Sequence, residues 1–181
     1  MSTLKEALKK WEEKNGMPIG EAKTVRLLMC QPLLQKLDSN LQQMQQVEKL
    51  SLSTNIIDKI SNLSGLSHLR ILSIGRNNLK KIEGLDALSD TLEELWISYN
   101  QIEKCNGLEQ LKKLKVFYCA NNRIKTWDAL AILKDLPLLE EINLFGNPLE
   151  EKCSQDGTWR DLMSKQCQAL KKLDGKIVMR L

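Results

Sequence analysis

Leu95-Trp96-Ile97-Ser98-Tyr99-Asn100-Gln101-Ile102 carries two apolar residues at positions i and i+2, an asparagine three positions later, and a further apolar residue two positions beyond it. This spacing occurs five times in the chain of 181 residues, and successive asparagines lie 22, 23, 22 and 25 residues apart. The five segments are residues 50–57, 72–79, 95–102, 117–124 and 142–149. A fixed period of this length indicates one structural unit repeated along the chain.

The period and the pattern are typical of leucine-rich repeats. In each repeat the apolar pair points inward from a short strand, and the residue between them points outward. The asparagine at the turn can bond backbone groups of neighbouring repeats that would otherwise lack partners. We therefore predict an α/β fold, a leucine-rich-repeat solenoid of about six 22-residue repeats with a parallel sheet on its concave face and helical caps at both ends.

The chain divides into three parts by pattern. Residues 1–46 are predicted to form an N-terminal helical cap with a transitional half-repeat, and residues 47–149 the leucine-rich repeats. Residues 150–181, where the repeat is lost, are predicted to form a C-terminal cap. Such caps are needed because a terminal repeat otherwise exposes its core.

Helical periodicity places the elements of the two caps. Thr3 and Glu6 form a capping box ahead of an amphipathic helix over residues 3–14. A second helix is expected over residues 20–30 and a closing helix over residues 158–170. A strand-like return through Leu170-Lys171-Lys172-Leu173-Asp174-Gly175 is expected to end the fold.

Composition narrows the function classes. The net charge of +4 is too small to require nucleic acid, although it permits an acidic partner. No apolar run approaches the roughly 20 residues that span a bilayer, and the N-terminus has no apolar segment of a secretory signal. We therefore expect no nucleic-acid partner, no membrane partner and a chain that is monomeric in isolation.

Cysteine usage favours a reducing compartment. The count is odd and no two cysteines have the C-x-x-C spacing, so neither a disulfide framework nor a zinc site is expected. Cys105 and Cys119 occupy repeat positions that are otherwise aliphatic, which favours burial as small apolar residues. The pattern indicates an intracellular protein without a bound metal.

The outward strand positions are unusually apolar for a solvated sheet. The middle outward residues are Ser51, Ser73, Trp96, Tyr118 and Asn143, with Ile71, Val116 and Phe145 beside them. An aromatic side chain buries about 150–250 Å² when covered, so this patch exceeds what a monomer usually exposes. The alternative is that the aromatic residues pack on one another across strands. The protein-binding residues that we predict are Ile71, Ser73, Arg76, Glu94, Trp96, Val116, Tyr118, Asn143 and Phe145.

Charged residues near this face have two interpretations. Arg70, Arg76 and Arg123 are expected near its edges, with Glu93 and Glu94 opposite them. They form a polar rim that orients a partner, or they are solvated charges on turns.

The sequence does not favour an enzyme. The single histidine, His68, comes at a turn with no nucleophile or carboxylate that the pattern places beside it. The outward serines have no G-x-S-x-G context, and neither a P-loop nor a G-x-G-x-x-G motif occurs. We expect a non-enzymatic protein with no cofactor, no catalytic residues and no metal site.

Runs that include residues outside the core pattern carry a closer resemblance. They are residues 50–55, 69–73, 75–77, 80–83 and above all 90–102, with Lys5-Glu6-Ala7, Trp11-Glu12-Glu13, Glu21-Ala22 and residues 170–175 in the caps. Together they resemble the leucine-rich-repeat light chains of axonemal outer-arm dynein over nearly the whole chain.

The resemblance implies a non-catalytic subunit that binds the dynein heavy chain through its sheet face, at the microtubule-binding domain on the stalk tip. It implies regulation of microtubule engagement and ciliary motility, tubulin as a further contact, and a place in the cytoplasm, the cytoskeleton and the axoneme of the cilium or flagellum. Trp96 and Tyr118 match hydrophobic sheet positions of the family, and Phe145 replaces an aliphatic residue. The family continues past Gly175 into a charged helix, whereas only residues 176–181 follow here, so roles of that helix are not carried over.

A second hypothesis is a regulatory or scaffold leucine-rich-repeat protein of the phosphatase-regulator or splicing-factor type, which shares the 22-residue period. Absence from cilia would favour it over the dynein hypothesis.

Overall fold

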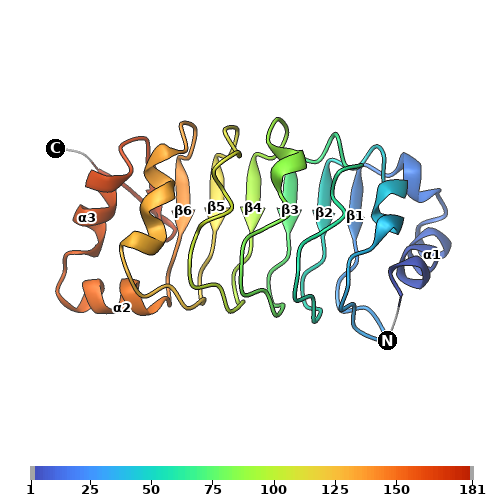
Figure 1. Ribbon diagram of the computed structural model, residues 1–181, viewed down its shortest axis with the longest axis horizontal. Helices are drawn as coiled ribbons and strands as arrows, with labels where there is room; N and C mark the ends of the chain where they lie inside the picture. The colour runs from blue at the N-terminus through green and yellow to red at the C-terminus, as the bar shows by residue number, and fades with distance from the viewer. Residues whose placement is uncertain (1–2, 180–181) are drawn as a thin grey trace.

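A computed structural model describes residues 3–179 as a row of short strands in one sheet (Figure 1). Within these residues eight strands lie side by side in chain order, and all neighbours are parallel except the last pair. This arrangement confirms the predicted leucine-rich-repeat solenoid. The strands are β1 (Thr24–Arg26), β2 (Lys49–Ser51), β3 (Ile71–Ser73), β4 (Glu94–Trp96), β5 (Val116–Tyr118), β6 (Glu141–Asn143), β7 (Lys172–Leu173) and β8 (Lys176–Ile177).

Helices close both ends of the row, as predicted. In Figure 1, α1 lies at the N-terminal end, and α2 and α3 lie at the C-terminal end. Between several strands the chain forms short 3₁₀ helices, which lie on the back of the solenoid. The α-helices are α1 (Leu4–Asn15), α2 (Pro148–Gln155) and α3 (Trp159–Gln166), and the 3₁₀ helices are η1 (Ile19–Glu21), η2 (Ser39–Gln43), η3 (Asp86–Leu88) and η4 (Asp128–Asp135).

The inward strand residues form one continuous core. At the centre of each of the strands β1 to β6 lies a buried apolar residue, which pairs with its counterpart in the next strand, as Leu72 does with Leu95 and Leu95 with Phe117. The parallel register therefore places equivalent inward residues of successive repeats against each other, and the core is continuous from repeat to repeat. The sheet is consequently a rigid platform whose outward residues are fixed by strand geometry.

The five repeat asparagines are buried and tie each repeat to the preceding one. Asn100 donates from Nδ2 to the carbonyls of Ile97, in its own repeat, and Ile74, in the preceding repeat, at 2.9 and 3.0 Å. Its Oδ1 accepts from the backbone N–H of Leu79 at 2.9 Å. The Ile74 carbonyl also accepts from Asn77. The bonds thus form a continuous ladder, which confirms the role predicted for the asparagines.

The predicted helix over residues 20–30 is wrong. The chain forms η1 and then β1, which pairs in parallel with β2. Val25 and Leu27 are buried, whereas Leu28 and Met29 are 49% and 59% exposed. Residues 24–28 therefore alternate between exposed and buried with the period of a strand, and pairing with β2 satisfies backbone groups that a helix would have bonded internally.

The C-terminal cap also differs from the expected single helix. Helix α2 begins at Pro148, directly after the last repeat asparagine, a position where proline is favoured because its missing N–H has no helical partner. Helix α3 ends at Gln166 instead of residue 170, and Leu162 on it is 40% exposed. The predicted strand-like return is present as the hairpin of β7 and β8. None of the described helices is long and apolar enough to cross a membrane.

Candidate functional site on the concave sheet

Two rows of outward side chains cross the sheet. One row, here called the aromatic column, is fixed by the pairing of Arg26, Ser51, Ser73, Trp96, Tyr118 and Asn143. The other, here called the edge column, is fixed by the pairing of Thr24, Lys49, Ile71, Glu94, Val116, Glu141 and Lys172. Seven of the nine predicted site residues therefore lie in two adjacent rows.

Trp96 and Tyr118 form the centre of the aromatic column. Their rings are stacked, with centroids 5.7 Å apart and planes inclined by 23°. The cross-strand packing considered as an alternative thus occurs for this pair. The stacking still leaves Trp96 37% exposed. Phe145, which follows β6 and is not part of the stack, is 62% exposed. The stack orients the aromatic surface without covering it.

A hydrogen bond fixes the phenol of Tyr118. Its hydroxyl donates to the Glu141 carboxylate, which also pairs with Lys172 at 2.9 Å. Burial, together with this hydrogen bond, raises the pKa of Tyr118 to about 12. The hydroxyl therefore stays protonated at neutral pH and keeps the ring in place as part of the sheet surface.

Arg70, Glu93 and Lys115 form a charge network beside the edge column. The Glu93 carboxylate accepts from Arg70 Nε at 2.9 Å and from Lys115 Nζ at 2.8 Å. These hydrogen bonds, that of Arg70 foremost, lower the pKa of Glu93 from 4.5 to about 2. Glu93 was expected opposite the arginines, but it is bound directly to one of them. The network joins two cations to one carboxylate, so it keeps one net positive charge.

This network predicts a contribution to stability that depends on pH. Because the pKa of Glu93 is lowered on folding, the contribution is complete above about pH 4.5 and is lost as pH falls toward about 2. We expect Glu93→Gln to be less stable than the wild type at pH 7 and the difference to shrink below about pH 4.5. Urea unfolding followed by circular dichroism at several pH values measures this, with the exposed Glu103→Gln as control. A difference that stays constant down to pH 2.5 would contradict the charge network.

Two predicted residues lie outside the two columns. Arg76, in the turn after β3, places its guanidinium 4.2 Å from the ring centroid of Tyr99. This contact engages Arg76 at the turn rather than on the sheet. Phe145 follows Asn143, whose side-chain oxygen accepts from the Phe145 N–H at 3.2 Å. Tyr99, 48% exposed, was not predicted as a site residue, although it lies in the same quoted stretch as Trp96.

The N-terminal end of the concave face was missed by the sequence prediction. There a hollow of about 360 Å³ lies between β1 and Trp96, above the short side chains of Ser51 and Ser73. Arg26 and Leu28 form its far side. The sequence does contain a signal for strand β1. Val25 and Leu27 form an apolar pair 25 residues before the pair of Leu50 and Leu52. It was obscured because Cys30 stands where the repeat asparagine would be.

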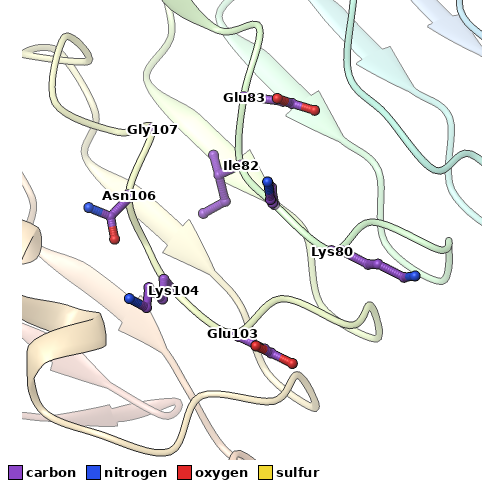
Figure 2. A pocket seen from close by; sticks show the side chains of 8 residues that line it. Lys80, Ile82, Glu83, Glu103, Lys104, Asn106 and Gly107 are labelled. Carbon is purple, nitrogen blue, oxygen red and sulfur yellow. The ribbon is translucent and has the colours of Figure 1, made fainter.

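A second hollow, of about 520 Å³, lies on the back of the solenoid, away from the sheet (Figure 2). Residues 80–83, 103, 104, 106 and 107, from two successive repeats, line it. Its charges are mixed and it has no aromatic residue, in contrast to the concave face. Among residues 3–179 no group of three or more His, Cys, Asp or Glu could hold a metal ion. The concave sheet, with its exposed aromatic residues, is therefore the candidate site.

Comparison with known proteins relates the chain to named families. Residues 90–132 match the sequence profile described as Leucine Rich repeats (2 copies). The chain is 59% identical over 179 residues to Dynein axonemal light chain 1 of Ciona intestinalis, covering 99% of this chain and 94% of that protein. It is 50% identical over 177 residues to the protein of the same name from Chlamydomonas reinhardtii, covering 96% and 89%. The crystal structure of internalin C2 from Listeria monocytogenes aligns with a TM-score of 0.55 at 30% identity, over 62% of this chain and 48% of that one.

Proposed function

The chain belongs to the dynein axonemal light chain 1 family, and on that premise we propose that it is a non-catalytic light chain of outer-arm dynein in the axoneme of cilia or flagella. Its partner in this proposal is the dynein heavy chain, at the microtubule-binding domain on the stalk tip. Its role is to regulate how that domain engages the microtubule, with tubulin as a further contact.

The observation that carries the proposal is the exposed aromatic stack on a rigid sheet. Trp96 and Tyr118 are held in place by stacking and by the Tyr118–Glu141 hydrogen bond before any partner arrives. Side chains that are already ordered lose little conformational entropy on binding, and Trp and Tyr are enriched among residues that dominate interfaces. Ile71 and Val116, half-buried in the edge column, add apolar surface beside the stack.

The proposal is tested by removing the exposed ring. Isothermal titration calorimetry is performed with this protein and a recombinant microtubule-binding domain of an outer-arm dynein heavy chain. We expect Trp96→Ala to weaken binding by about 2 kcal/mol, or roughly thirtyfold, because a central aromatic anchor is lost. The matched control is Leu138→Ala, which removes a 47% exposed side chain from the turn before β6.

Two results would reject the proposal in different ways. If the wild-type protein does not bind the heavy-chain domain, the partner is wrong. If it binds but Trp96→Ala and Leu138→Ala have equal, small effects, the partner stands and the concave face is not the binding surface. Thermal unfolding of each variant confirms that lost affinity is not lost folding.

A further inference from the structure

Unpaired cations gather at the N-terminal end of the concave face. The hollow beside Trp96 adjoins a smaller one, of about 170 Å³, against helix α1, because Arg26 and Leu28 line both. The linings of the two hollows contain four cationic residues and no carboxylate; the cations are Lys10, Lys14, Arg26 and Lys49. The linings of these two hollows are thus basic, in a chain whose charges are otherwise mixed.

None of these four cations makes an ion pair within residues 3–179. Lys10 donates to the backbone carbonyl of Gln31 at 3.0 Å, which does not neutralise its charge. The nearby carboxylate of Glu48 is engaged by Lys23 at 3.1 Å. The cations of the hollows are therefore available to an anionic group of another molecule.

Apolar surface lies among these cations. Leu28 and Met29 are 49% and 59% exposed on the chain that leaves β1. Trp11 lines the smaller hollow, and Ile71 and Trp96 line the larger one. Cationic and apolar groups side by side fit a polypeptide segment that carries carboxylates next to large apolar residues.

The charge of the sheet changes sign along the row of strands. In the edge column Lys49 and Glu94 lie on either side of Ile71, so their backbones are about 10 Å apart at a strand spacing of about 4.8 Å. Neither side chain is bound to the other, and the Glu94 carboxylate makes no ion pair or hydrogen bond within the described part of the chain. The concave face therefore presents free cations at β1 and β2 and a free carboxylate at β4.

We propose that the N-terminal end of the concave face, formed by Arg26, Leu28 and Lys49, is a subsite for an acidic and apolar segment of the partner, and that it sets the direction in which the partner lies across the sheet. In this arrangement the acidic part of the segment lies over β1 and β2, the apolar part meets Trp96, and a basic side chain meets Glu94. The inference rests on the proposed function only in that the same partner occupies the face.

Charge reversal tests the subsite. We expect the double variant Arg26→Glu/Lys49→Glu to bind the heavy-chain microtubule-binding domain about tenfold more weakly at low salt, because two attractive exposed pairs become repulsive. The loss is expected to diminish at high salt through screening. The matched control is Lys80→Glu/Lys104→Glu, the same change of charge on the back of the solenoid, where both lysines are exposed (Figure 2). Equal effects of the two double variants at every salt concentration would overturn the subsite.

A peptide titration tests, without the heavy chain, whether the subsite prefers acidic segments. Two synthetic amphipathic peptides with the same leucine face, one bearing glutamates and the other lysines, are titrated into the ¹⁵N-labelled protein. We expect the acidic peptide to shift the backbone NMR signals of Arg26, Leu28 and Lys49, and the basic peptide to leave them unchanged. If the wild type fails to bind the heavy-chain domain, the proposed partner is rejected, and this titration alone judges the subsite. Shifts that are equal for both peptides, or that survive in Arg26→Glu/Lys49→Glu, would overturn it.

Discussion

Exchanging Gly107 for alanine is expected to lower the free energy of unfolding by about 4 kcal/mol or more. Gly107 has φ of +102°, and a Cβ added there would lie 1.9 Å from the carbonyl oxygen of Ile82 in the preceding repeat. That oxygen belongs to the backbone of a packed segment, so the two repeats must move apart to make room. The variant therefore combines backbone strain with a widened contact between repeats.

Urea and thermal unfolding measure the effect, and for a chain of this length about 4 kcal/mol corresponds to a fall of roughly 8–16 °C in Tm. Gly157→Ala is the matched control, since Gly157 also has a positive φ, +70°, but a Cβ there would have no atom within 4 Å. It reports the cost of the backbone conformation alone, about 1 kcal/mol. Equal losses in the two variants would show that close packing at Gly107 contributes nothing.

Replacing Asn100 by alanine is expected to cost about 3 kcal/mol of stability. The backbone N–H of Leu79 loses its bond to Asn100 Oδ1 and remains buried, and an unsatisfied buried group costs about 1–3 kcal/mol. The carbonyls of Ile74 and Ile97 each lose one donor. Each keeps a hydrogen bond from a second asparagine, Ile74 from Asn77 and Ile97 from Asn122. The remaining loss comes from these weakened bonds and from the small cavity.

The same unfolding experiments check this value, with Asn106→Ala as control because Asn106 is exposed on the back of the solenoid (Figure 2). We expect the control to change stability by less than about 0.5 kcal/mol. An Asn100→Ala variant as stable as the control would mean that the ladder of asparagines does not hold the repeats together.

The regular repeats could be predicted because two local signals coincide in each of them. The apolar pair fixes the strand and the asparagine fixes the turn, so Leu95, Ile97 and Asn100 suffice for one repeat. The first strand, β1, has the apolar pair but lacks the asparagine, and its residues also satisfy a helical period. Pairing with β2, a contact between residues 25 positions apart in sequence, decides between the two periods. Such a tertiary contact has no local signature.

The two columns of the candidate site follow from strand geometry, which is why most of their members could be placed. The partners of long charged side chains could not be predicted in this way, because such side chains reach beyond their own repeat. Glu93, for example, reaches Arg70 and Lys115 in the two neighbouring repeats. The same limit applies to Arg76, which turns toward Tyr99 instead of the sheet. The hollow at the N-terminal end depends on the absence of large side chains at Ser51 and Ser73 together with the position of β1. No single residue of the sequence therefore predicts this hollow.

The asparagine ladder also limits which changes of length the chain tolerates. Each step joins one repeat to the preceding one by the same set of bonds, as Asn77 joins to Leu52 and Asn100 to Ile74. Removing or adding one complete repeat leaves every other step unchanged, so the solenoid can gain or lose whole periods. A deletion of one residue between the apolar pair of a strand and its asparagine breaks a step and shifts the inward residues of that strand outward. We therefore expect viable length variants to differ by about 22 residues, whereas smaller insertions are confined to the turns.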